Sequence, residues 1–175
     1  KLAIFYIVAQ CLGAFLGALI MNFLSFNLQP MDIVNNHWIR AMVQESLGTF
    51  IVVFFFMTQT EEKMLFSKEK AINCFIIAAS YVAARCMFYG STATASVYGS
   101  CLNPAMSIGI TLAALFNNGF SAFKYIWIYP IMPLVGSLAA LFFYEFVFKK
   151  TQEILDHSHG EDNDQNNEDA LLENH

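Results

Sequence analysis

Long apolar runs alternate with short polar segments along this chain. Four runs, at about 2–24, 38–57, 71–91 and 124–148, are longer than the roughly 10 to 14 residues typical of a buried helix in a soluble protein. Each is close to the about 20 residues that a helix needs to cross the ~30 Å hydrocarbon core of a bilayer. The pattern therefore predicts four transmembrane helices.

A fifth and shorter apolar segment, 103–116, begins at a polar start signal. Asn103 can accept hydrogen bonds from the free N–H groups of a new helix, and Pro104 suits the first helical position because its φ is already helical. The segment meets a C-cap and turn signal at Asn117-Asn118-Gly119. Pro104 to Phe116 would rise only about 20 Å, so we expect a re-entrant half-helix. Lipid cannot satisfy its free N–H groups, so it must begin in protein or beside water.

The first apolar run also carries small residues at helical spacing. Gly13 and Gly17 lie one turn apart, with alanines at 9, 14 and 18. Small residues let two membrane helices approach closely. This stripe predicts a packing face for a neighbouring helix.

Composition agrees with a membrane protein. The chain is 57% hydrophobic and 15% aromatic, with only 13% charged residues. Its net charge of −5 comes mainly from residues 151–175, an acidic segment that we expect to be disordered. No basic patch with interleaved aromatic residues indicates nucleic-acid binding.

Lysine and arginine predict the orientation. Placing Lys1, the 58–70 loop and Lys149-Lys150 on one side collects six basic residues there, against Arg40 and Lys124 on the other. The richer side should be cytoplasmic. The C-terminal tail is then cytoplasmic, and the half-helix enters from outside.

The chemistry of the spans argues against other membrane functions. The four cysteines have no zinc or redox spacing, so no metal or other cofactor is expected. An intramembrane enzyme needs a nucleophile with a base or metal ligands, and a proton-coupled transporter needs titratable relays. The spans offer no histidine, and as titratable relays they offer only Glu45, Arg85 and Glu145. We therefore expect no enzyme.

Several strings of residues, in order along the chain, resemble one known family. Residues 99–109, Gly-Ser-Cys-Leu-Asn-Pro-Ala-Met-Ser-Ile-Gly, resemble the second signature loop of the aquaporin, or major intrinsic protein, family. Residues 9–18 are similar to its third helix, and Glu45 with Thr49-Phe50 matches the Glu-x3-Thr-Phe pattern of its fourth. The sixth helix is matched by Trp127, Tyr129, Pro133, Gly136 and Tyr144.

The resemblance implies an all-α membrane protein with a partial aquaporin-like fold of four transmembrane helices and one re-entrant half-helix. The first two spans and the first Asn-Pro-Ala loop of that fold have no counterpart here, so the chain is expected to be a fragment. The implied activity is passive flux of water or small neutral solutes such as glycerol or urea, by a homotetramer in a lipid bilayer. A non-conducting junction or scaffold protein of the same fold is the alternative.

The resemblance also implies which residues line the pore. The Asn103 amide keeps N–H groups to donate into the lumen after its oxygen caps the helix, and the positive end of the helix dipole repels cations there. Backbone carbonyls before the cap would form a ladder of acceptors. The predicted pore-lining residues are Ser91, Gly99, Ser100, Cys101, Leu102, Asn103, Pro104, Ala105 and Met106.

One departure from the family affects selectivity. Members of the family usually have arginine where this chain has Met106, and Ser91 and Ser100 match the other two positions of the outer constriction. An uncharged and wider mouth follows, as in glycerol-permeable members. Selectivity among water, glycerol, urea and ammonia stays open.

Two charged residues inside the spans are expected to support the structure. The resemblance implies that Glu45 accepts hydrogen bonds from the signature loop, with direct contact to permeant as the alternative. Arg85 and Glu45 lie at similar depths in their spans, which permits a buried ion pair between them. Arg85 is about −120° around its helix from Ser91, so the two are not expected to face the lumen together.

Overall fold

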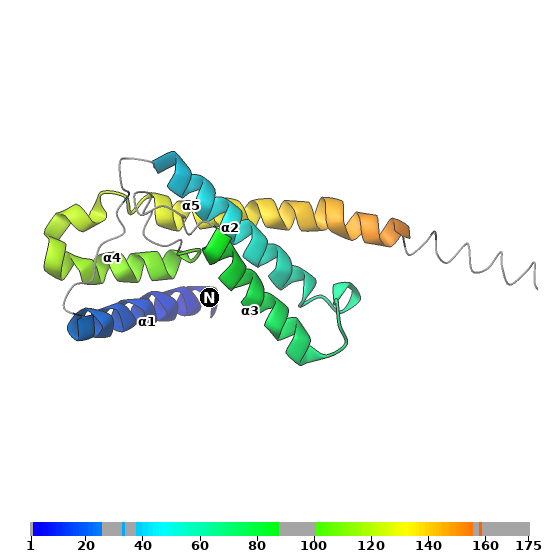
Figure 1. Ribbon diagram of the computed structural model, residues 1–175, viewed down its shortest axis with the longest axis horizontal. Coiled ribbons are helices and arrows are strands. Elements are labelled where there is room, and N and C mark those ends of the chain that lie inside the picture. The colour runs from blue at the N-terminus through cyan, green and yellow to red at the C-terminus, as the bar shows by residue number, and fades with distance from the viewer. Residues whose placement is uncertain (1, 26–32, 34–37, 88–100, 156–157, 159–175) are drawn as a thin grey trace, which may run out of the picture. The chain divides into compact units, whose positions relative to one another are not determined.

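The computed structural model describes residues 2–25, 33, 38–87, 101–155 and 158 of the chain. Regular structure in this part is helical, without strands, in agreement with the predicted all-α fold. The chain divides into two compact units, Lys1–Ala140 and Leu141–His175. Figure 1 shows the helices and their labels. The principal helices are α1 (Leu2–Ser25), α2 (Trp38–Thr58), α3 (Lys70–Met87), α4 (Pro104–Asn118) and α5 (Ile128–Phe143); the short segments are η2 (Glu62–Met64), η3 (Gly119–Phe123) and η4 (Tyr144–Phe148).

Within the described residues, four helical stretches are long and apolar enough to cross a membrane: Leu2–Leu24, Trp38–Thr58, Pro104–Phe123 and Ile128–Leu155. This set differs from the predicted one. α3 is not among them, and residues 88–91 of that predicted span lie outside the described residues. The predicted half-helix is instead part of a stretch long enough to cross a membrane, because η3 continues directly from α4. The α-helical part of that stretch, 15 residues, still rises only about 22 Å.

The last span begins later than its predicted start at 124. Residues 119–127 form successive tight turns, such as the bond from the Lys124 N–H to the Ser121 carbonyl at 3.2 Å. α5 begins only at Ile128, with Pro130 in its first turn, where a missing N–H costs no helical hydrogen bond. Proline position, rather than the start of the apolar run, sets this boundary.

Within the first unit, α1 and α4 pack side by side (Figure 1). Gly109 of α4 makes the close contact, since a Cβ added there would lie 2.5 Å from the backbone of Ala14. Gly13 and Gly17 of α1 have no described atom within 4 Å of such a Cβ. Ala14 of the predicted small-residue face therefore meets α4, whereas the two glycines of that face lie beside this contact.

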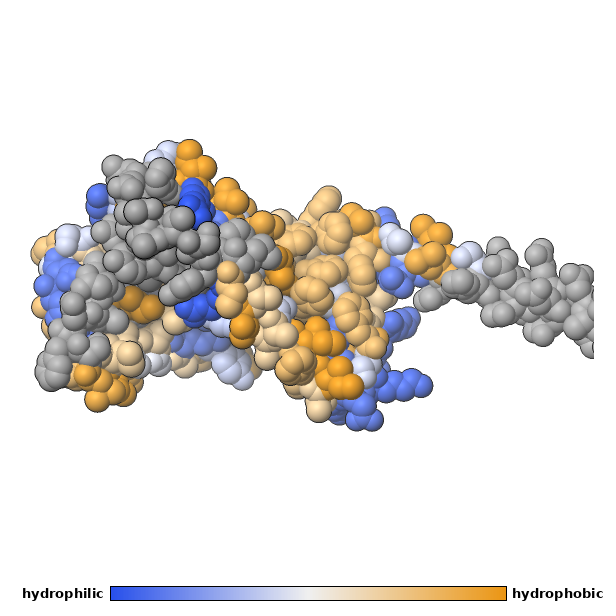
Figure 2. Space-filling model, in the orientation of Figure 1, coloured by the Kyte–Doolittle hydropathy of each residue, from blue (hydrophilic) through white to orange (hydrophobic). Residues whose placement is uncertain are grey.

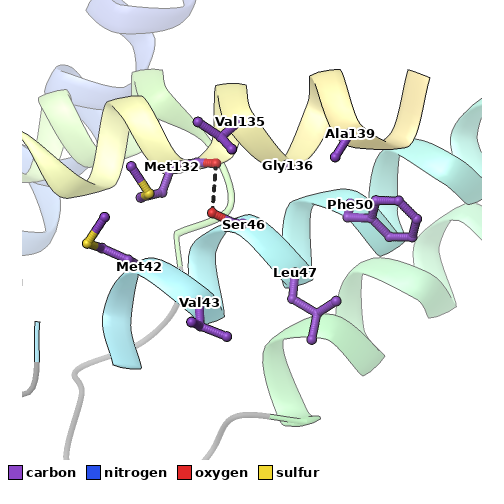
Figure 3. A pocket seen from close by; sticks show the side chains of 9 residues that line it. All are labelled: Met42, Val43, Ser46, Leu47, Phe50, Met132, Val135, Gly136 and Ala139. Atoms are coloured by element: carbon purple, nitrogen blue, oxygen red, sulfur yellow. Dashed lines mark hydrogen bonds between the residues drawn. The ribbon is translucent and has the colours of Figure 1, made fainter. Parts of the chain in front are cut away.

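α2 packs against α5 at a second glycine. A Cβ on Gly136 would lie 2.1 Å from the Ser46 carbonyl oxygen, so only glycine admits this approach. The Ser46 hydroxyl donates to the Met132 carbonyl at 3.3 Å, as Figure 3 shows. Beside this contact lies an apolar groove of about 450 Å³, lined by Met42, Val43, Ser46, Leu47, Phe50, Met132, Val135, Gly136 and Ala139.

In the second unit the helix continues past Lys150 to Leu155. Residues 151–155, which were predicted to belong to a disordered tail, are therefore helical. Gln152 and Glu153 are good helix formers, and Lys149 pairs with Glu145 one turn earlier at 4.0 Å. Of residues 156–175, only Ser158 is described.

Apolar side chains cover much of the surface that Figure 2 shows. Phe23, Phe75 and Phe120 are 74%, 72% and 87% exposed. Exposed aromatic residues in this number would be an aggregation hazard in water. Together with the four apolar helical stretches, they are typical of an integral, multi-pass membrane protein.

Candidate functional site

The site is built around the first turn of α4. Asn103 has extended backbone angles (φ −149°, ψ 115°), and its side-chain oxygen accepts from the Ala105 N–H at 2.9 Å. Pro104 occupies the first helical turn, and Gly119 closes the helix with a φ of 57°. The predicted N-cap and C-cap are thus confirmed. The Asn103 side chain is exposed, and its amide nitrogen has no hydrogen-bond partner within the described residues.

The backbone just before the cap is held by one carboxylate. Glu45 of α2, only 1% exposed, accepts from the Cys101 N–H at 2.8 Å and from the Leu102 N–H at 2.9 Å. Hydrogen bonds to an ionised acceptor are stronger than neutral ones. Two of them from one carboxylate fix the direction in which the chain enters α4.

This anchoring compensates for an unfavourable backbone conformation. Leu102 has a φ of 53°, in the left-handed region that costs a non-glycine residue of order 1–3 kcal/mol. Its side chain lies over Gly48, where an added Cβ would come 2.5 Å from a Leu102 methyl carbon. Gly48 is one turn beyond Glu45. A single face of α2 therefore accepts hydrogen bonds from the loop and makes room for the Leu102 side chain.

The buried polar residues of α4 are satisfied by their own helix. The Ser107 hydroxyl donates to the Pro104 carbonyl and the Thr111 hydroxyl to the Ser107 carbonyl, each at 2.8 Å. Both side chains are fully buried. They keep α4 regular without offering hydrogen-bonding groups to a solute.

Cys101 is held from α3 as well. The Tyr81 hydroxyl donates to the Cys101 carbonyl at 3.5 Å, and the Arg85 guanidinium lies over the Tyr81 ring at 5.9 Å. Burial raises the pKa of the Cys101 thiol to about 12; the negative charge of Glu45 adds to this shift and the positive charge of Arg85 opposes it. The loop therefore lies between a bound carboxylate and a cation.

The predicted ion pair between Glu45 and Arg85 is not what the described part of the chain shows. Glu45 bonds the loop N–H groups, and Arg85 stacks on Tyr81. Similar depth in the two spans permitted the pair, but the Glu45 carboxylate instead accepts hydrogen bonds from the loop N–H groups.

The other predicted site residues fall into four groups. Ser91, Gly99 and Ser100 lie outside the described residues. Cys101, Leu102 and Ala105 are buried, at 3%, 7% and 7% exposure. Asn103 is exposed and Pro104 partly so. Met106 is half-buried and packs against an apolar cluster of Ile33, Ala41, Cys101, Tyr125, Ile128 and Tyr129.

Two contributors were missed by reasoning from the sequence. Gly48 could have been found, since it lies three residues after Glu45 and so on the same helix face. Tyr81 carried no such signal. Its contact with Cys101 joins residues 20 positions apart, and only the packing of α3 against α2 brings them together.

Comparisons with known proteins bear on this geometry. The family model described as Major intrinsic protein matches residues 1–144, a range that includes both Glu45 and the capped helix α4. The chain is 28% identical over 155 residues to Probable aquaporin PIP-type pTOM75 of Solanum lycopersicum, covering 84% of this chain and 51% of that protein. It is 30% identical over 154 residues to Probable aquaporin PIP2-1 of Oryza sativa subsp. japonica, again covering 84% and 51%.

The chain spans about half the length of these curated relatives. The family match nevertheless takes in every helix from α1 to α5. The chain therefore belongs to the major intrinsic protein family.

Proposed function

We propose that the protein to which this chain belongs is a membrane channel for passive flux of water and small neutral solutes. The observation that carries the proposal is the first turn of α4, where Asn103 uses its oxygen as the helix cap and leaves its amide N–H groups exposed. A neutral solute can accept a hydrogen bond from this amide. The relatives named as aquaporins support the same reading.

Electrostatics at this point favour neutral solutes over cations. The N-terminus of a helix carries roughly half a positive charge. Cations and hydronium approaching Asn103 are repelled, whereas water, glycerol or urea meets a hydrogen-bond donor. We propose Pro104, Ala105 and the backbone of 99–102 as the rest of this narrow region.

Glu45 has a supporting role in this proposal. Its carboxylate is used by two backbone N–H groups of the loop, so we assign it to positioning rather than to contact with solute. The C-terminal segment would face the cytoplasm, because the basic residues gather on that side. A homotetramer, as the family resemblance implies, completes the proposal.

Asn103→Asp tests the role of the donor without removing the cap. Aspartate caps helices as well as asparagine does, but it cannot donate and it adds negative charge. In liposomes containing the whole protein, we expect wild type to conduct water or glycerol above empty vesicles. We expect Asn103→Asp to conduct neutral solutes more slowly and to leak cations.

Asn118→Asp, at the opposite end of the same helix and with no side-chain cap hydrogen bond, is the matched control and should behave as wild type. Wild-type flux no greater than that of empty vesicles would refute the channel and favour a junction or scaffold role. Normal flux and cation exclusion in folded Asn103→Asp would remove Asn103 from the path.

A further inference from the structure

Arg85 is a charged residue that the proposed pore does not use. α3 packs against α2, and Tyr81, one turn before Arg85, reaches the loop that Glu45 anchors. Glu45 lies inside a stretch apolar enough to cross a membrane, seven residues or about 10 Å from its first residue. Arg85 therefore lies at membrane depth, beside the entrance to α4.

The described surroundings of Arg85 do not neutralise it. Its guanidinium carbon lies over the Tyr81 ring, 5.9 Å from the ring centre, and no carboxylate of the described residues forms an ion pair with it. The carboxylate of Glu45 accepts hydrogen bonds from the loop. The Arg85 side chain is only partly buried. A charged side chain within a membrane protein almost always faces the bundle interior or a water-filled cavity, because facing lipid is costly.

Tyr81 connects this cation to the site. Its ring face holds the guanidinium, and its hydroxyl bonds the carbonyl of Cys101, two residues before Asn103. The influence of Arg85 on the Cys101 thiol agrees with this proximity. The residue expected to lie at the constriction, Met106, is uncharged and packs partly into the apolar cluster.

We infer that Arg85, held on Tyr81, is the fixed cation of the conduction path and determines the exclusion of cations beside the Asn103 end of α4. The inference rests on the proposed channel function. Arg85 faces the water that Asn103 also meets, and its full positive charge adds to the half-charge of the helix terminus. Tyr81 positions the guanidinium through its ring.

The test compares leak of protons and potassium with water flux in liposomes containing the whole protein. Arg85→Gln removes the charge at similar length, and we expect the ratio of cation leak to water flux to rise about tenfold, as for loss of a unit charge several ångströms from a path. Arg85→Lys, which keeps the charge, should stay near wild type. Arg40→Gln removes an exposed arginine at the start of α2 and should change nothing.

Tyr81 supplies a second and independent pair of variants. Tyr81→Leu removes the ring that holds the guanidinium and should raise the leak ratio, whereas Tyr81→Phe keeps the ring and should not. If Arg85→Gln yields no folded protein, the comparison of Tyr81→Leu with Tyr81→Phe tests the inference in its place. Equal leak ratios in Tyr81→Leu and Tyr81→Phe, or a wild-type ratio in folded Arg85→Gln, would overturn the inference. Absence of solute flux in wild type would instead refute the proposed channel itself.

Discussion

At the scale of single residues, one buried carboxylate determines how the chain enters α4. Glu45 receives two backbone N–H groups, and one of them belongs to Leu102, whose φ of 53° is unfavourable. The same helix face provides Gly48, which makes room for the Leu102 side chain. Anchoring and strain therefore occur together, in the three residues that precede Pro104.

Glu45→Gln should destabilise the protein by about 1.5–3 kcal/mol, the range for losing a hydrogen bond to a charged group. Glutamine has one accepting oxygen, so one loop N–H is left without its partner. The measurement is thermal unfolding of the purified protein in detergent. Glu145→Gln, an exposed residue with a single long ion pair, is the control and should shift stability by less than about 0.5 kcal/mol. Equal effects of the two variants would contradict the anchoring role.

Cys101 should react slowly with thiol reagents, because it is buried and its pKa is raised to about 12. The thiolate is the reactive form, so a raised pKa keeps the thiol neutral and inert until the pH approaches that value. Cys74 and Cys86 are exposed. Maleimide labelling followed by mass spectrometry at about pH 8 should modify these two well before Cys101. Faster labelling of Cys101 would place its side chain in an open, hydrated path.

At the scale of helices, two glycines set the closest approaches. Gly109 lets α4 meet the α1 backbone, and Gly136 lets α5 meet the α2 backbone at Ser46. In both cases the neighbouring atoms belong to the main chain and cannot rotate away. Ser46 adds a hydrogen bond across the second contact (Figure 3).

Gly136→Ala should therefore cost about 1–3 kcal/mol or more, because the helices must separate to admit one methyl group. Gly13→Ala is a matched control in another apolar helix, with no described atom within 4 Å of the added carbon. It should be neutral or slightly stabilising, since alanine favours helix. The comparison needs only the unfolding temperatures of the two variants and wild type. Similar losses for both would mean that Gly136 is not at a close helix contact.

At the scale of the whole molecule, the selectivity of the proposed channel should depend on where positive charge lies along its path. Met106→Arg in the whole protein should lower the ratio of glycerol to water permeability, because a long cation on the first turn of α4 would narrow the mouth. Liposome swelling measured with each solute gives the ratio. Met106→Leu, which stays apolar, is the control. An unchanged ratio in folded Met106→Arg would show that this side chain stays with the apolar cluster instead of lining the path.

Much of the molecule could be predicted from the order of residues alone, because its signals are local. Apolar runs predicted a helical membrane protein, and Asn103-Pro104 with Gly119 predicted both ends of α4, since caps act within one or two turns. The family resemblance also came from short strings, and the family match confirms it. Helix ends without such local signals could not be predicted from the apolar pattern. The start at Ile128 and the helical stretch to Leu155 both differ from the boundaries of the apolar run.

Only the tertiary structure decided which residues meet. Ala14, rather than the glycines beside it, faces Gly109, because the rotation of α1 about its axis is set by its neighbour and not by its own sequence. Glu45 bonds the loop instead of Arg85, and Arg85 is left on Tyr81. The sequence determined that Glu45 and Arg85 would lie at similar depths in their spans. The loop contacts of Glu45 and Tyr81 were decided by packing, since they join residues between 20 and 57 positions apart that have no local means of recognising one another. Arg85 and Tyr81, in contrast, lie one helical turn apart.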